Sequence, residues 1–294
     1  MQPEATSAED LFMAERPRLV GIAYRMLGSM AEAEDVTQDV FLRWRERRPE
    51  DLREAAAWLT TVTVRLCLDQ LRSARARRES YVGPWLPEPV DALAIDPFDS
   101  LAEREDLSLA LLLALEALSP RERAAFLLHD VFDYSFAEVA GTLTTSVANC
   151  RQLASRARRK LRAERPGPRA SRAELDRLYD RFEAACATAD VDALLALLDD
   201  DAELLSDGGG KVLAALNPIH GATNVARFLT GIAGKAPPDI LICRLELNGG
   251  PATVVYVDGE PYVSIHLDAD GSRIRRILAV RNPDKLRRVP PPRN

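Results

Sequence analysis

The sequence predicts a multidomain protein in which all-α domains are followed by a smaller α+β domain. Residues from about 7 to 165 show the apolar periodicity of helices, interrupted by one proline-rich stretch. The segment Pro166-Gly167-Pro168 is the clearest boundary in the chain. Beyond it, short runs rich in Val, Ile and Tyr alternate with glycine turns, which is typical of strands. Helices followed by such a meander of strands indicate an α+β domain.

The first predicted domain, residues 7–80, is helical with hardly any breakers. Apolar residues at helical spacing form three stripes, around Leu19, Val40 and Leu66. Residues 81–100 follow as a linker of extended character, because prolines recur there and disfavour helix. The two later domains are predicted at 101–165 and 171–289.

The strongest local signal lies between residues 119 and 162. Ser119-Pro120-Arg121-Glu122 has an N-cap serine, a proline at the first helical position and a glutamate at the third. Ser135-Phe136-Ala137-Glu138 repeats the capping box, and after a short break Ser146 can cap another helix. A short capped helix, a tight turn and a second helix predict a helix-turn-helix.

The helix that begins at Ser146 has one apolar face and one polar, basic face. Residues of the polar face with the chemistry to contact DNA are Asn149, Arg151, Gln152, Ser155, Arg156 and Arg159. The amides and the first arginine suit base edges, and the later arginines suit phosphates. A solvated amphipathic helix in a bundle is the alternative interpretation of this pattern.

The α+β domain should open with two helices, at about 171–187 and 191–198. The strands are then predicted at 202–205, 240–247, 253–257, 262–267 and 273–280. Asp258-Gly259 and Asp270-Gly271 supply hairpin turns between them.

Composition limits the classes of function. The net charge is −6, which disfavours tight binding of nucleic acid by the chain alone, although arginines cluster at 72–78 and 151–165. The four cysteines are far apart, which argues against zinc and disulfides and suits a reducing cytoplasm. The N-terminus lacks the apolar core of a signal peptide, and no apolar run is long enough to span a bilayer. We therefore expect a cytoplasmic protein with no metal and no cofactor.

Two motifs resemble those of a known family. The run from Ala33 to Trp44, followed by Trp58-Leu59 and the run Leu68-Asp69-Gln70-Leu71-Arg72, is similar to the second conserved region of sigma-70-family proteins. The helix-turn-helix resembles their fourth region. A short linker with no third region between them is similar to the extracytoplasmic-function (ECF) group. Asparagine is common in the family where this chain has Arg65, and an aliphatic residue where it has Cys150.

The resemblance implies a sigma factor that directs transcription initiation with core RNA polymerase on promoter DNA. The clamp of the largest polymerase subunit should bind the helix that carries Asp35, Gln38, Asp39, Leu42 and Trp44. The helix over 58–78 should face the minus-ten element, with Arg65, Arg72 and Arg75 holding the DNA backbone. The helix from Ser146 should read the minus-thirty-five element.

Three further motifs resemble a subgroup whose C-terminal extension is SnoaL-like, with the NTF2-like fold. They are Trp85-Leu86-Pro87 in the linker, Asp207-Gly208-Gly209-Gly210-Lys211, and Asn282-Pro283-Asp284-Lys285-Leu286. The resemblance implies that these residues make regulatory contacts through which the domain modulates the sigma factor in cis. By itself, the glycine run could equally be a flexible turn.

Two other classes of function stay open at the level of sequence. One is a stand-alone helix-turn-helix regulator with a ligand-sensing C-terminal domain. An unknown small-molecule ligand is a candidate partner of that domain in the sigma-factor interpretation as well. The other is a small-molecule isomerase or cyclase, which we disfavour because no spacing among the three histidines suggests a designed pair. The residues with suitable chemistry would be Asp207, His220, Tyr256, Tyr262 and His266.

Overall fold

The structure, a computed structural model, describes residues 8–46, 52–91, 108–164, 170–235 and 239–292. The chain divides into two compact units, which are described separately below. The first unit comprises Met1–Glu79, Leu93–Asp106 and Leu112–Arg165, and the second comprises Ser80–Ala92, Leu107–Leu111 and Pro166–Asn294. The first part of the predicted linker therefore belongs with the α+β domain.

Three helices open the first unit: α1 (Ala8–Leu27), α2 (Met30–Glu46) and α3 (Leu52–Glu79). They pack on one another through the predicted apolar stripes, with Leu19, Val40 and Leu59 fully buried. Gly28 adopts a positive φ of 71° just after α1, which turns the chain into α2.

The helix-turn-helix of the first unit comprises α7 (Pro120–Phe126), the π-helical turn η1 (Leu127–Val131), α8 (Phe136–Leu143) and α9 (Val147–Glu164). Both predicted capping boxes are confirmed, since Ser119 and Ser135 accept from the N3 amide and the N3 glutamate accepts in return. Ser146 accepts from the Asn149 amide, which confirms the third cap. Helix α6 (Leu109–Leu115) precedes these elements, and Thr144 makes the tight turn before α9 with a φ of 49°.

A curved six-stranded sheet forms the second unit, with strand order β2-β1-β6-β5-β4-β3. The strands are β1 (Leu198–Asp207), β2 (Ile219–His220), β3 (Ile240–Leu247), β4 (Gly250–Val257), β5 (Glu260–Asp270) and β6 (Arg273–Val280). β1 and β6 are parallel, and the other neighbours are antiparallel. The predicted bounds of β3 and β6 match the structure, and the α+β prediction is confirmed.

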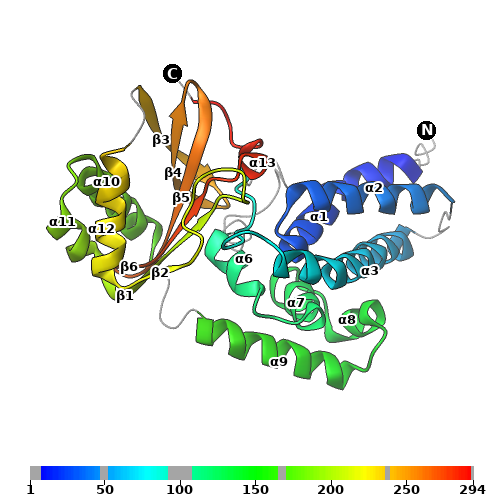
Figure 1. The fold of residues 1–294 in the computed structure, drawn as a ribbon. Helices are drawn as coiled ribbons and strands as arrows, with labels where there is room; N and C mark the ends of the chain where they lie inside the picture. Colours follow the sequence, from blue (N-terminus) through cyan, green and yellow to red (C-terminus); the bar gives the residue numbers. More distant parts are fainter. Residues whose placement is uncertain (1–7, 47–51, 92–107, 165–169, 236–238, 293–294) are drawn as a thin grey trace. The chain divides into compact units, whose positions relative to one another are not determined.

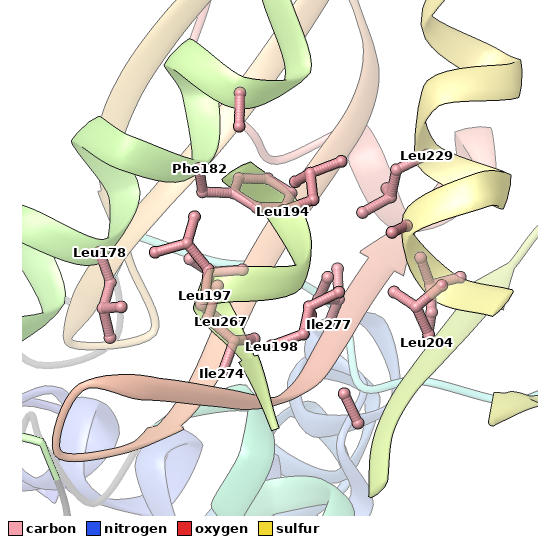
Figure 2. Close-up of a cluster of buried hydrophobic side chains, with 14 of the residues drawn as sticks. Leu178, Phe182, Leu194, Leu197, Leu198, Leu204, Leu229, Leu267, Ile274 and Ile277 are labelled. Atoms are coloured by element: carbon pink, nitrogen blue, oxygen red, sulfur yellow. The ribbon is translucent and has the colours of Figure 1, made fainter. Parts of the chain in front are cut away.

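Three helices cover one face of this sheet (Figure 1): α10 (Arg172–Ala187), α11 (Val191–Leu197) and α12 (Ala222–Ala233). Figure 2 shows Phe182, Leu194 and Leu229 meeting Leu267 and Ile277 of the sheet, so apolar side chains fill the space beneath the helices. Helix α12 was not predicted from the sequence, because its N-cap is Gly221, which offers no side-chain capping signal.

The chain returns to the sheet at two further places. Val90 of the linker exchanges hydrogen bonds with Asn248, whose amide donates to the Val90 carbonyl (2.7 Å) and whose side-chain oxygen accepts from the Val90 amide (3.2 Å). The short helix α13 (Pro283–Leu286) follows β6 and buries Leu286. In the described part of the chain, no helix combines the length and the hydropathy needed to cross a membrane.

Candidate functional site

The Asp207 carboxylate, at the end of β1, is the centre of a polar cluster in the second unit. Its side chain is fully buried. It accepts hydrogen bonds from the Tyr81 hydroxyl (2.6 Å), the Leu86 amide (2.9 Å) and Lys285 Nζ (2.6 Å). Burial of a carboxylate is costly unless it is paired and hydrogen-bonded, and this one is both. We call Tyr81, Trp85, Leu86, Asp207, Asn282 and Lys285 the Asp207 cluster.

The backbone of Asp207 holds the segment that follows β6. Its carbonyl accepts from the amides of Arg281 (2.7 Å) and Asn282 (2.8 Å). The Asn282 side chain then caps α13 through the Asp284 amide (3.1 Å) and donates to the Tyr81 hydroxyl (2.9 Å). One asparagine thus connects the helix start to the linker.

Lys285 gives the cluster its counter-charge and touches the linker from the same side. Its ammonium lies 4.3 Å from the centroid of the Trp85 ring and 5.2 Å from that of Tyr81, and it also donates to the Leu86 carbonyl. Burial, together with the hydrogen bond to Asp207, raises the pKa of Tyr81, so its hydroxyl stays a donor.

The glycine run lies where other atoms come too close for a side chain. A Cβ on Gly209 would stand 2.3 Å from Asn282 Nδ2, and the φ there is +61°. A Cβ on Gly210 would stand 3.1 Å from the Val82 Cβ. Close approach to another part of the chain, rather than flexibility, therefore requires these glycines.

Charged pairs surround the cluster. Lys211 pairs with Asp284, and this hydrogen bond lowers the pKa of the Asp284 carboxyl. Arg288 pairs with the buried Glu88 of the linker (3.3 Å). Pro87 and Leu286 are buried, and Pro283 is exposed at the start of α13.

The structure thus brings together the three motifs that sequence resemblance singled out. It adds Tyr81, Val82 and Glu88, which the sequence analysis did not name as site residues. An aromatic hydroxyl directly before a proline-rich linker motif was the available signal for Tyr81.

On α2, the residues expected to bind polymerase divide into two groups. Asp35, Gln38, Asp39 and Leu42 are exposed. Trp44 is only 2% exposed and its ring centroid lies 5.8 Å from that of Trp58. Trp44 is therefore a core residue of the helical domain and offers no surface to a partner, in contrast to the sequence-based expectation.

On α3, the basic residues expected to hold DNA point to solvent where they are described. Arg65 is exposed and donates to the Thr144 hydroxyl (3.0 Å), and Arg72 pairs with Asp69 (3.3 Å). The side chain of Arg75 lies outside the described residues.

Helix α9 presents the predicted polar face. Arg151, Gln152, Ser155, Arg156 and Arg159 are exposed, and Cys150, Leu153 and Ala157 are buried on the opposite side. Asn149 is half-buried.

Some of these side chains have partners within the protein. Asn149 donates to the Thr145 hydroxyl (2.9 Å), and Arg151 lies over the Phe136 ring. Glu122, which the sequence analysis recognised only as a cap, pairs with Arg156 (3.3 Å) and Lys160 (2.8 Å) and so ties α9 to α7.

The residues considered for catalysis have separate structural partners. Asp207 is bound to the linker, His220 is exposed beside Glu203, and the Tyr256 hydroxyl donates to the Pro290 carbonyl (2.6 Å). His266 is buried against the Ser264 hydroxyl (2.6 Å), and burial lowers its pKa to about 3.

Comparisons with known proteins agree with this architecture. The model of Sigma-70 region 2 matches residues 11–77, and the model of Sigma-70, region 4 matches residues 108–161. The ECF RNA polymerase sigma factor SigJ of Mycobacterium tuberculosis is 38% identical over 290 residues, which cover 94% of this chain and 92% of that protein. The probable ECF RNA polymerase sigma factor SigI of the same organism is 31% identical over 275 residues, covering 93% of this chain and 92% of SigI.

A solved structure of SigJ matches most of the chain. The crystal structure of M. tuberculosis SigJ superposes with a TM-score of 0.75 at 34% identity, and covers 93% of this chain and 96% of that chain. An NTF-2 like protein of unknown function from Burkholderia xenovorans matches 36% of this chain and 81% of its own at 18% identity, with a TM-score of 0.28. The prediction of helical sigma domains followed by an α+β domain is confirmed. With a relative of this identity and coverage, the chain belongs to the ECF RNA polymerase sigma factors.

Proposed function

We propose that this chain directs promoter-specific transcription initiation by core RNA polymerase in the cytoplasm, and that its α+β domain modulates this activity in cis. Family membership supports the first part. The Asp207 cluster supports the second part. The linker joins the two sigma domains, and the cluster attaches this linker to the C-terminal domain.

The exposed face of α2 is the proposed polymerase-binding surface. It carries Asp35, Asp39 and Leu42 around Gln38, all of which are exposed. An acidic surface that also exposes an apolar residue suits a basic helical partner. A partner that holds DNA itself compensates for the net charge of −6.

The exposed face of α9 is the proposed reader of the minus-thirty-five element. Arg151 and Gln152 project from its first turns, where a recognition helix contacts base edges. Arg65 and Arg72 on α3 are proposed to hold the DNA backbone near the minus-ten element.

The single observation that carries the regulatory part is the buried Asp207 carboxylate with its two linker donors. If the linker left, the Asp207 carboxylate would lose the Tyr81 hydroxyl and the Leu86 amide and keep only Lys285, so release of the linker has a free-energy cost. That cost makes the domain a restraint on the linker rather than a passive extension.

Catalysis and ligand sensing are not part of this proposal. Apolar side chains occupy the interior beneath α10, α11 and α12, where a ligand of an NTF2-like domain would need a cavity (Figure 2). A small-molecule ligand thus stays a prediction from the sequence.

The proposal is tested by run-off transcription with core polymerase, comparing Lys285→Met with Lys211→Met. Both lysines pair with an aspartate, but the Lys285–Asp207 side chains are 12% and 0% exposed, and the Lys211–Asp284 side chains are 52% and 41% exposed. Loss of the buried pair should change transcription and expose the linker to protease, and loss of the solvated pair should change neither strongly.

Equal linker protection and equal transcription in the Lys285→Met variant and the parent would refute regulation through the cluster. Absence of any core-dependent transcript from the parent, on promoters selected with the holoenzyme, would refute the sigma-factor proposal itself. Tight binding of duplex DNA by the chain without polymerase would favour a stand-alone regulator.

A further inference from the structure

Carboxylates hold several basic side chains of α9. Arg156 and Lys160 pair with Glu122 (3.3 and 2.8 Å). Arg158 pairs with Asp130 (2.7 Å). Each of these carboxylates takes up N–H donors of its partner and offsets the positive charge that would meet a phosphate. The three basic side chains can therefore bind DNA only in competition with an acidic group of the protein itself.

Arg151, in the second turn of α9, is held by an aromatic ring instead. Its Cζ atom lies over the Phe136 ring, 5.7 Å from the ring centroid, which is within the range of a cation–π contact. A ring attracts the guanidinium without binding its N–H groups to a carboxylate oxygen. The contact therefore leaves the charge and the N–H donors of Arg151 available to a ligand, and the side chain is exposed.

The Phe136 ring is itself fixed in place. Phe136 is the first residue of α8, directly after the N-cap Ser135. The His129 ring packs against it with the centroids 3.8 Å apart and the planes at 32°. His129 lies in the π-helical turn η1, and its Nδ1–H donates to the Tyr134 carbonyl (2.8 Å), which fixes the orientation of the imidazole. Two rings in contact thus connect η1 to the Arg151 guanidinium.

A guanidinium that is oriented in advance suits the recognition of one base. An arginine can donate two N–H groups to O6 and N7 of a guanine in the major groove. A freely moving surface arginine loses rotamer freedom when it binds in this way, and the loss weakens binding. Contact with Phe136 removes part of that loss beforehand, and it disfavours rotamers of Arg151 that would turn the guanidinium to a phosphate.

We propose that Phe136 is a positioning residue, which holds Arg151 in the orientation that reads a guanine of the minus-thirty-five element. This inference rests on the proposed function, since it uses α9 as the reader of that element. Phe136 affects the choice of base through Arg151 and makes no contact with the base itself. A ring that only filled the space between α8 and α9 would instead affect the stability of the fold and not the choice of base.

Base discrimination by the holoenzyme tests the proposal. The measured quantity is the ratio of initial run-off rates, at subsaturating holoenzyme, on the matched promoter and on promoters with one substituted base. Arg151→Ala identifies the base concerned, which should be a guanine. Phe136→Leu should lower the ratio at that base by roughly 2- to 5-fold, the strength of an exposed cation–π contact, and leave the ratios at other bases unchanged. Phe136→Tyr keeps the ring and should retain the ratio of the parent.

A double variant separates positioning from a structural role. In Arg151→Ala/Phe136→Leu the ratio should equal that of Arg151→Ala alone, since no guanidinium is left for the ring to hold. Partial unfolding of a variant cancels, because the ratio compares two promoters with the same protein. Phe132→Leu is the matched control: Phe132 is also half-buried, and its ring centroid lies 5.0 Å from Arg25, which is not on α9. Its ratios should equal those of the parent.

An unchanged ratio in Phe136→Leu, or a further loss in the double variant, would overturn the positioning role. Loss of discrimination in Phe136→Tyr equal to that in Phe136→Leu would do the same. An effect of Arg151→Ala that is equal on all promoter sequences, or that falls on a base other than guanine, would overturn the orientation proposed for Arg151. If the parent holoenzyme shows no base discrimination in the minus-thirty-five element, the proposed function of α9 fails instead.

Discussion

Replacing Gly209 with alanine tests whether close packing at the Asp207 cluster holds the linker. Gly209 has a φ of +61°, and a Cβ there would stand 2.3 Å from Asn282 Nδ2 and 3.1 Å from the Tyr81 hydroxyl. The Asn282 amide must then move by about 1 Å, which breaks its hydrogen bond to Tyr81 and weakens the cap of α13. Loss of the hydrogen bond to Tyr81 and weakening of the α13 cap should each destabilise the attached linker by about 1 kcal/mol.

Backbone strain adds to this cost and has to be separated from it. Alanine at a positive φ costs of the order of 1 kcal/mol at any position. Gly259→Ala is the matched control, because Gly259 has a φ of +80° and nothing within 4 Å of an added Cβ. The difference between the two variants is therefore the contact cost, about 1–2 kcal/mol, or roughly 5- to 30-fold in the equilibrium for linker release.

Amide exchange of Leu86 gives the direct measurement. Its N–H donates to the Asp207 carboxylate (2.9 Å), so it exchanges only when the linker leaves the cluster. We expect amide exchange of Leu86 to be roughly 5- to 30-fold faster in Gly209→Ala than in Gly259→Ala. Equal exchange rates in the two variants would refute the argument that the glycine run is there for close approach.

Three further results are expected. His266 has a pKa of about 3 in the folded protein and about 6.5 in the unfolded chain, so the unfolded chain binds the extra proton as the pH falls. The free energy of unfolding should therefore keep its full value above pH 6.5 and be about 2 kcal/mol lower at pH 5. Denaturant titrations of His266→Gln at the two pH values should lack this loss. Trp44→Ala should destabilise the helical unit by about 3–5 kcal/mol because the Trp44 side chain is 2% exposed. Leu42 is 49% exposed, so Leu42→Ala should keep the fold and weaken binding of core polymerase. Equal midpoints of thermal unfolding in the two variants would contradict the assignment of Trp44 to the core. Arg151→Ala should cost about 1–3 kcal/mol of holoenzyme affinity for one base at the minus-thirty-five element, as measured on a panel of point-substituted promoters. Arg158 is paired with Asp130 (2.7 Å), so Arg158→Ala should have a smaller effect that is equal on all promoter sequences.

Local features of the fold were predictable because they depend on neighbouring residues. The capping boxes at Ser119 and Ser135 join residues three apart, so a segment of four residues contains both partners of each interaction. The bounds of β3 and β6 followed from β-branched residues between turn signals. Helix α12 was not predictable in this way, since Gly221 begins it without a capping side chain.

The sequence by itself determined the helical and α+β halves, the helix-turn-helix and the motifs that indicated the family. Only the tertiary structure decided which face of α2 is buried, since an aromatic stripe fits a core as well as a docking surface, and Trp44 proved to be core. It also decided the Asp207 cluster, because Tyr81 and Asp207 are 126 residues apart and no local pattern relates them. Contacts across such separations depend on how the sheet, the linker and the helix pack together, and that packing cannot be inferred from a short stretch of sequence.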